Sequence, residues 1–81
     1  MLNLMEERVK ELAKKASLET WRTDLGIHIG RSREEIVSVR LDHFLGDFDV
    51  YRNGSLAPGL SFDACLREVA SVIRGVAKLA V

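Results

Sequence analysis

The spacing of the apolar residues changes twice along the chain, and these changes constrain the fold more than any other feature. Up to residue 16, apolar side chains recur at the three- and four-residue intervals of one helical face. Between residues 21 and 51 they alternate with polar side chains, as in half-buried strands. From residue 62 the helical spacing returns. We therefore expect all 81 residues to form a single α+β domain with a helix at each end.

The two predicted helices differ in the width of their apolar faces. The first, Asn3–Ser17, has a stripe that spans only ~80° of the helical wheel. The second begins at Phe62, after Ser61 as its N-cap, and its apolar arc spans ~180°. Because one face of a sheet cannot cover so wide an arc, we expect part of it to meet the first helix and part to meet another molecule.

Short tight turns between the strands predict antiparallel pairing. Three strands are expected, at Trp21–Gly30, Val37–Leu41 and Phe48–Tyr51. Asn53-Gly54 is a two-residue hairpin signal, which leaves open a short fourth strand at Ser55–Ala57 before Pro58-Gly59 breaks the chain. The expected element order is α-β-β-β-(β)-α.

This order predicts a two-layer sandwich with both helices on one face of a small antiparallel sheet. The helix-covered face is expected to consist of Leu25, Ile27, Ile29, Val37, Val39, Leu41, Phe48 and Val50. The opposite face is expected to present to solvent Arg22, Asp24, His28, Ser38, Arg40, Asp42, Asp49 and Tyr51.

The charge balance and the single cysteine limit the function classes. Twelve basic residues balance twelve acidic ones, whereas a dedicated nucleic-acid binder usually has a basic excess. Cys65 has no second cysteine with which to form an intramolecular disulfide. We expect no signal peptide and no membrane span, and hence a cytoplasmic protein.

One acidic cluster and one cysteine are the candidates for metal binding or catalysis. Asp42, His43, Asp47 and Asp49 cluster near a turn, but they lack a recognised ligand spacing and are typical of a solvated acidic turn. Cys65 falls inside the apolar arc of the second helix, where a thiol acts as a small hydrophobic residue. We therefore expect no enzyme activity, no cofactor and no metal.

The wide apolar arc predicts a protein-binding module, such as an adaptor, a chaperone-like protein or an inhibitor. Contiguous exposed apolar surface on a small protein usually marks an interface, and a homodimer is the expected form. The residues expected in that interface are Val72, Val76, Leu79 and Ala80. The alternative is that the first helix and the sheet cover the whole arc in a monomer.

A basic stripe on the second helix supports a second hypothesis. Arg67, Arg74 and Lys78 line one side of that helix, and Arg31 and Arg33 lie in a turn. These side chains are candidate contacts for an acidic protein or for nucleic acid, and the alternative is an ordinary solvated helix face. Nucleic-acid binding is thus the runner-up to protein binding.

The element order is similar to that of the double-stranded RNA-binding domain, but the functional motifs of that family are missing. The second helix opens Ser61-Phe62-Asp63, where that family has lysines. The turn Gly30-Arg31-Ser32-Arg33 replaces its Gly-Pro-x-His loop. The likeness is in element order alone, so no residue role is carried over.

Overall fold

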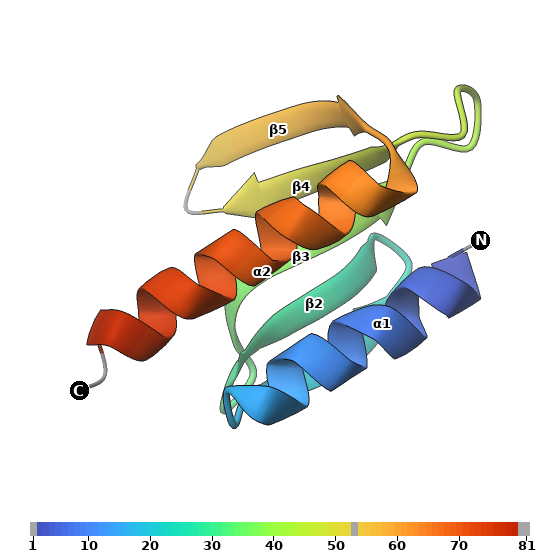
Figure 1. Cartoon of the computed structure of the whole chain (residues 1–81). Helices are drawn as coiled ribbons and strands as arrows, with labels where there is room; N and C mark the ends of the chain where they lie inside the picture. The colour runs from blue at the N-terminus through green and yellow to red at the C-terminus, as the bar shows by residue number, and fades with distance from the viewer. Residues whose placement is uncertain (1, 53, 80–81) are drawn as a thin grey trace.

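The computed structural model describes residues 2–52 and 54–79, and it confirms the predicted α+β class. Two helices and five strands follow one another in the order α-β-β-β-β-β-α. Their bounds are α1 Leu2–Lys15, β1 Glu19–Thr23, β2 Gly26–Arg31, β3 Glu34–Leu41, β4 Phe48–Arg52, β5 Ser55–Leu60 and α2 Phe62–Leu79. Both helices lie on the same face of the sheet (Figure 1).

The sheet is a simple meander. Its strands lie in the order β1-β2-β3-β4-β5, and every neighbouring pair is antiparallel. Helix α1 packs over β1, α2 packs mainly over β4, and the two helices contact each other (Figure 1). One face of the sheet is therefore covered by a helical layer, and the other carries no helix. We call these the inner and the outer face.

The predicted strand Trp21–Gly30 is wrong, because the chain reverses at Asp24 and Leu25 to form the β1–β2 hairpin. The reversal has local causes. The Thr23 hydroxyl accepts a hydrogen bond of 3.2 Å from the backbone N–H of Leu25, and Gly26 has a φ of 144°. Leu25, expected in the core, is consequently 58% exposed.

The hairpin also changes which side chains share a face. Trp21 pairs with His28, so both lie on the outer face of the sheet. Arg22, expected on the solvated face, pairs with Ile27 and reaches α1 instead. Its guanidinium donates a hydrogen bond of 2.8 Å to the Asn3 side chain.

The optional fourth strand of the prediction exists, and it continues past the expected break. As β5 it runs through Pro58 and Gly59 to Leu60. Proline is tolerated because β5 is an edge strand, where a missing N–H interrupts no ladder. The irregular register opposite Asp49 is held by a 3.0 Å hydrogen bond from the Gly59 N–H to the Asp49 carboxylate.

Helix α1 ends two residues before its predicted end at Ser17. Ser17 adopts a left-handed conformation with a φ of 58°. The backbone N–H of Leu18 then bonds to the carbonyl of Ala13 at 2.9 Å, which closes the last turn. At the other helix, the Ser61 hydroxyl accepts from the Ala64 N–H at 3.2 Å, so the predicted N-cap is confirmed.

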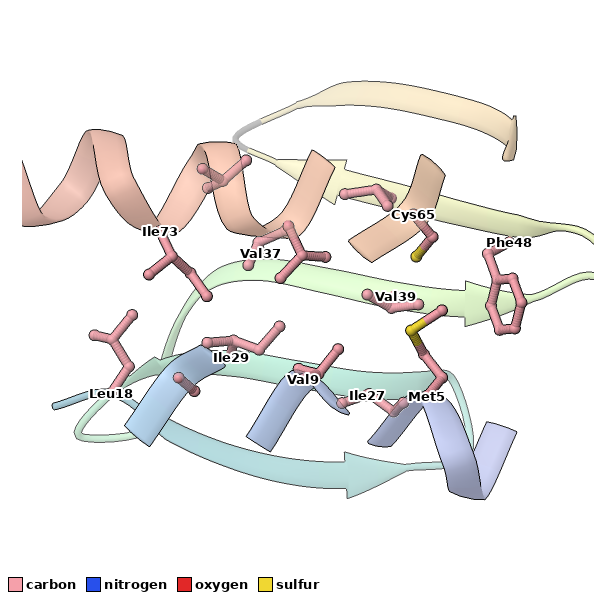
Figure 2. Close-up of a cluster of buried hydrophobic side chains, with 14 residues drawn as sticks. Met5, Val9, Leu18, Ile27, Ile29, Val37, Val39, Phe48, Cys65 and Ile73 are labelled. Atoms are coloured by element: carbon pink, nitrogen blue, oxygen red, sulfur yellow. The ribbon is translucent and has the colours of Figure 1, made fainter. Parts of the chain in front are cut away.

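The hydrophobic core lies between the helical layer and the inner face of the sheet (Figure 2). Both helices and all three central strands contribute to it. Its buried members are Met5, Val9, Ala13, Leu18, Ile27, Ile29, Val37, Val39, Phe48, Val50, Cys65, Val69, Val72 and Ile73. The narrow stripe of α1 thus suffices to cover its part of the sheet.

Two residues predicted to face solvent are buried on the outer face. His28 is 7% exposed and Ser38 is fully buried. The indole of Trp21 stacks on the His28 ring, and the Arg40 guanidinium lies 4.0 Å from the centre of the Tyr51 ring. Large side chains on neighbouring strands therefore shield the centre of this face without a helix.

Neither described helix is long and apolar enough to cross a membrane.

Candidate protein-binding groove

A groove runs between α1 and α2 on the side of the helical layer that faces away from the sheet. It consists of two adjoining hollows of about 280 and 260 Å³, which share Leu12, Lys15 and Ala70. The lining residues are Arg8, Glu11, Leu12, Lys15, Ala16, Leu66, Arg67, Ala70, Ile73 and Arg74. We call this feature the α1–α2 groove.

The floor of the groove is apolar, because the stripes of the two helices meet there. Leu12 and Ala16 come from α1 at i, i+4 spacing. Leu66, Ala70 and Ile73 come from α2 at i, i+4, i+7 spacing. All except the buried Ile73 remain partly exposed, and the two small alanines leave space between the helices. An apolar strip open to solvent is the result.

Four cations border this floor. Arg8 and Lys15 stand two helical turns apart on α1, and Arg67 and Arg74 stand two turns apart on α2. Among the described residues, none of the four takes part in an ion pair. Glu11 is the one acidic residue lining either hollow. The groove therefore joins an apolar floor to a predominantly positive rim.

The structure brings together only part of the basic set that the sequence predicted. Arg67 and Arg74 both border the groove. Arg31 and Arg33 lie at the β2–β3 turn instead, and the guanidinium of Arg33 lies 5.5 Å from the centre of the Trp21 ring. The side chain of Lys78 lies outside the described part of the structure.

The predicted interface on α2 is likewise divided. Val72 is 5% exposed and belongs to the core, so it offers almost no surface to a partner. Val76 is partly exposed near the end of the helix. The side chain of Leu79 and the whole of Ala80 lie outside the described residues.

Sequence reasoning missed the half of the groove that α1 supplies. Leu12 belongs to the narrow apolar stripe of the first predicted helix, and Arg8 and Lys15 lie on its polar side. The available signal was that these two cations flank Leu12 on both sides at helical spacing. Their position beside Arg67 and Arg74 depends on how the two helices pack, which periodicity does not specify.

Another hollow, of about 700 Å³, lies where β2 begins and β3 ends, and its mixed polar and apolar lining includes Asp42, His43 and Asp49. Two of its carboxylates already hold backbone turns. Asp42 accepts from the N–H groups of Phe44 and Leu45, and Asp49 accepts from that of Gly59. Within residues 2–52 and 54–79, no three metal-binding side chains come together.

Cys65 is fully buried at the start of α2. Burial and, to a lesser extent, the nearby charge of Glu68 together raise the pKa of its thiol to about 12. The thiol therefore stays protonated at neutral pH, whereas a nucleophilic cysteine must ionise. This residue acts as a core side chain.

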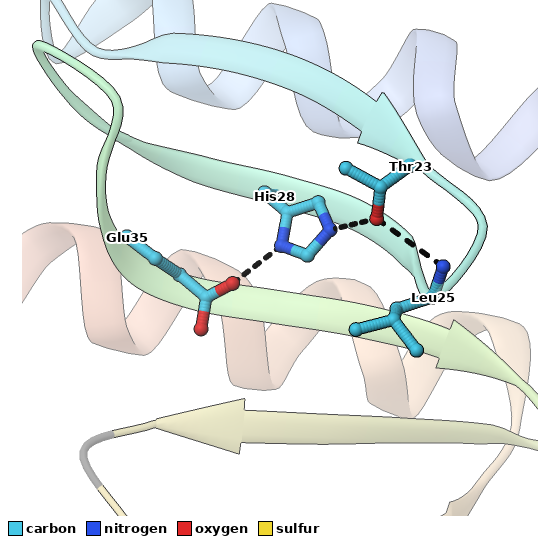
Figure 3. Close-up of polar contacts among 4 residues, drawn as sticks. All are labelled: Thr23, Leu25, His28 and Glu35. Carbon is cyan, nitrogen blue, oxygen red and sulfur yellow. Dashed lines mark hydrogen bonds and ion pairs between the residues drawn. The ribbon is translucent and has the colours of Figure 1, made fainter.

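On the outer face, His28 links three strands (Figure 3). Its Nε2 lies 2.5 Å from the hydroxyl of Thr23 on β1, and its Nδ1 pairs with the carboxylate of Glu35 on β3. Both ring nitrogens are thus engaged, and one ring face is covered by Trp21. This arrangement holds the sheet together and leaves no free nitrogen for a ligand or a substrate.

Comparison with known proteins finds no matching family model, and no curated protein or solved structure with significant similarity to the chain. The function proposed below is therefore derived from the geometry and charge of the α1–α2 groove.

Proposed function

We propose that the chain is a small protein-binding module, and that its α1–α2 groove receives an acidic amphipathic segment of a protein partner. One observation supports this proposal above all others. The apolar floor around Leu12 and Ala70 is bordered on both helices by cations that have no ion-pair partner among the described residues.

The apolar floor favours a segment with an apolar stripe. Two packed helices offer a groove into which the side chains of a third segment fit, as in other helix-in-groove complexes. Burial of Leu12 and Leu66 against such a stripe would supply affinity through the hydrophobic effect. An adaptor, a chaperone-like protein and an inhibitor would all use this mode of binding.

The positive rim favours acidic side chains beside that stripe. Charges at the border of an interface act mainly on the rate of association and on the choice of partner. Arg8 and Lys15 on one side, with Arg67 and Arg74 on the other, would attract a segment with carboxylates on both flanks. A basic amphipathic segment would be rejected by the same four charges.

Nucleic acid is the runner-up occupant, because Arg67 and Arg74 could also contact phosphates. A phosphate backbone would leave the apolar floor uncovered, and the chain has no net positive charge to attract it. We therefore favour a protein partner. The homodimer through α2 and the cytoplasmic location stay predictions, and a buried single thiol is compatible with a reducing compartment.

The test uses two designed helical peptides that share one leucine stripe. One carries glutamates on both flanks of the stripe, and the other carries lysines there. We expect the acidic peptide to bind and to shift the backbone NMR signals of Leu12, Ala16, Leu66 and Ala70. Binding that is equal for both peptides, or absent for both, would overturn the proposal.

Charge-reversal variants locate the site. Arg67→Glu combined with Arg74→Glu should weaken binding of the acidic peptide by about tenfold or more, because two favourable charge contacts become repulsive. Arg31→Glu combined with Arg33→Glu makes the same change of charge away from the groove and should leave binding unchanged. If a labelled single-stranded RNA binds more tightly than the acidic peptide, and more weakly with added salt, nucleic-acid binding replaces protein binding.

A further inference from the structure

The loop between β3 and β4 carries the most exposed pair of large apolar side chains in the described part of the chain. Phe44 is 96% exposed and Leu45 is 67% exposed. In Figure 1 this loop projects beyond the end of the sheet. A carboxylate stands on each side of the pair, on Asp42 and Asp47. Two large apolar side chains side by side at the surface make this loop a candidate contact site.

Hydrogen bonds hold this loop in one shape. The Asp42 carboxylate accepts from the N–H groups of Phe44 at 2.9 Å and Leu45 at 3.1 Å. The Gly46 N–H donates to the Asp42 carbonyl at 2.7 Å, and the Asp42 N–H donates to the Asp47 carbonyl at 2.8 Å. The two apolar side chains are therefore presented on a closed loop, which reduces the entropy lost on binding.

The loop has the chemistry that the α1–α2 groove accepts. The groove has an apolar floor between cations. The loop has an apolar pair flanked by Asp47 and by Asp42, one carboxylate oxygen of which already accepts from the loop backbone. The groove also has two adjoining hollows, of about 280 and 260 Å³, for two apolar side chains. The loop and the groove are thus complementary in apolar character and in charge.

The loop cannot enter the groove of its own molecule. It extends from the end of β3 and the start of β4 (Figure 1). The groove is lined by residues 8–16 of α1 and 66–74 of α2. The chain measures 40 Å along its longest axis, and the loop projects away from the helices (Figure 1). The contact must therefore join two molecules.

We propose that the chain self-associates head to tail, with Phe44 and Leu45 of one copy inserted into the α1–α2 groove of the next. This inference rests on the proposed function, because it names a second copy as the partner of the same groove. Two different surfaces meet in this contact, so each complex keeps one free loop and one free groove. Assembly then continues beyond the dimer, and a net charge of zero does not oppose it.

Complementation between two variants tests this arrangement. The loop variant is Phe44→Ser with Leu45→Ser, which keeps an intact groove. The groove variant is Arg67→Glu with Arg74→Glu, which keeps an intact loop. All four side chains are exposed, so both variants should retain the circular dichroism spectrum of the wild type. Sedimentation velocity over a concentration series measures the assembly of each.

We expect wild-type assemblies to grow beyond the dimer as the concentration rises. Each variant alone should remain monomeric at concentrations at least about tenfold above those at which the wild type assembles. A mixture of the two variants should form a one-to-one heterodimer and nothing larger, because the remaining loop and groove are both defective. Should the groove variant lose its structure, Arg8→Glu with Lys15→Glu is its replacement.

Two results would overturn head-to-tail assembly. The first is a wild-type protein that stays monomeric at millimolar concentration; binding of the acidic peptide would then still support the groove as a protein-binding site. The second is a wild-type dimer that survives in the loop variant and dissociates with Val76→Glu. That pattern belongs to a symmetric dimer through α2. Absence of binding by the acidic peptide would remove the proposed function as well.

Discussion

The imidazole ring of His28 lies flat against the indole ring of Trp21, with ring centroids 5.7 Å apart and planes inclined by 14°. The two residues belong to adjacent strands, β1 and β2, and pair directly across the hairpin. Hydrogen bonds to Thr23 and Glu35 extend this contact over three strands (Figure 3). The outer face of the sheet is thus stabilised by a polar and aromatic cluster in place of a helix.

We expect His28→Ala to lower the free energy of unfolding by about 1–3 kcal/mol, because the change removes the stacked ring and leaves Thr23 and Glu35 without their partner. Urea denaturation followed by circular dichroism measures this difference. His43→Ala, at an exposed position in the β3–β4 loop, is the matched control and should change stability by less than about 0.5 kcal/mol. Equal effects of the two changes would contradict a structural role for His28.

The sequence pattern predicted the helices and the central strands, but it missed the first hairpin. The apolar residues Trp21, Leu25, Ile27 and Ile29 all fall on odd positions, as on one face of a single strand. A two-residue turn reverses which parity faces the core, and Trp21 lies on the outer face with His28. The turn depends on the conformation of Gly26 and on a hydrogen bond to the Thr23 hydroxyl. Neither of these produces a change of period, so the alternation favoured a single long strand.

The hairpin can be tested by comparing two aliphatic residues that the single-strand prediction placed on the same buried face. Ile27→Ala should lower the free energy of unfolding by about 2–5 kcal/mol, because Ile27 is fully buried. Leu25→Ala should change it by less than about 0.5 kcal/mol, because Leu25 lies in the turn and is 58% exposed. A large loss of stability for Leu25→Ala would contradict the hairpin and support the prediction of a single strand.

The groove was only half predictable for a related reason. Helical spacing places Arg67 and Arg74 on one side of α2, and this much follows from the sequence. Which side of α1 they face depends on the crossing of the two helices, which is a property of packing. Val72 shows the same limit, since its place in the apolar arc did not reveal that the sheet covers it. Periodicity identifies the faces of an element but does not identify their partners.

Two glycines of β2 are required by the close approach of β3. A Cβ atom on Gly30 would lie 1.9 Å from the Glu34 carbonyl oxygen, and one on Gly26 would lie 2.2 Å from that of Val39. We expect Gly26→Ala and Gly30→Ala each to lower the melting temperature sharply, because backbone atoms must shift to make room. Gly75→Ala is the control, because a Cβ atom there meets no neighbour within 4 Å. Alanine in a helix is more stable than glycine by about 0.5–1 kcal/mol, so this variant should not lower the melting temperature. Similar melting temperatures for all three variants would exclude this explanation.

The buried thiol of Cys65 predicts a specific dependence of stability on pH. Burial raises its pKa from 9.0 to about 12, so the native state holds the proton more tightly than the unfolded chain does. The resulting stabilisation is fully present below about pH 9 and is lost as the pH rises from there towards 12. Tyrosine and lysine also titrate in this range, so the relevant quantity is the difference between the wild type and Cys65→Ala.

We expect the stability advantage of the wild type over Cys65→Ala to shrink between about pH 9 and pH 11, as measured by urea denaturation. The reactivity of the thiol provides an independent measurement at pH 8. Iodoacetamide should modify Cys65 rapidly in urea and slowly in the native protein, and Ile27→Ala should accelerate the native reaction because it raises the population of the unfolded state. A native thiol that reacts as fast as the unfolded one would show that Cys65 is accessible, and it would remove the argument against a nucleophilic role.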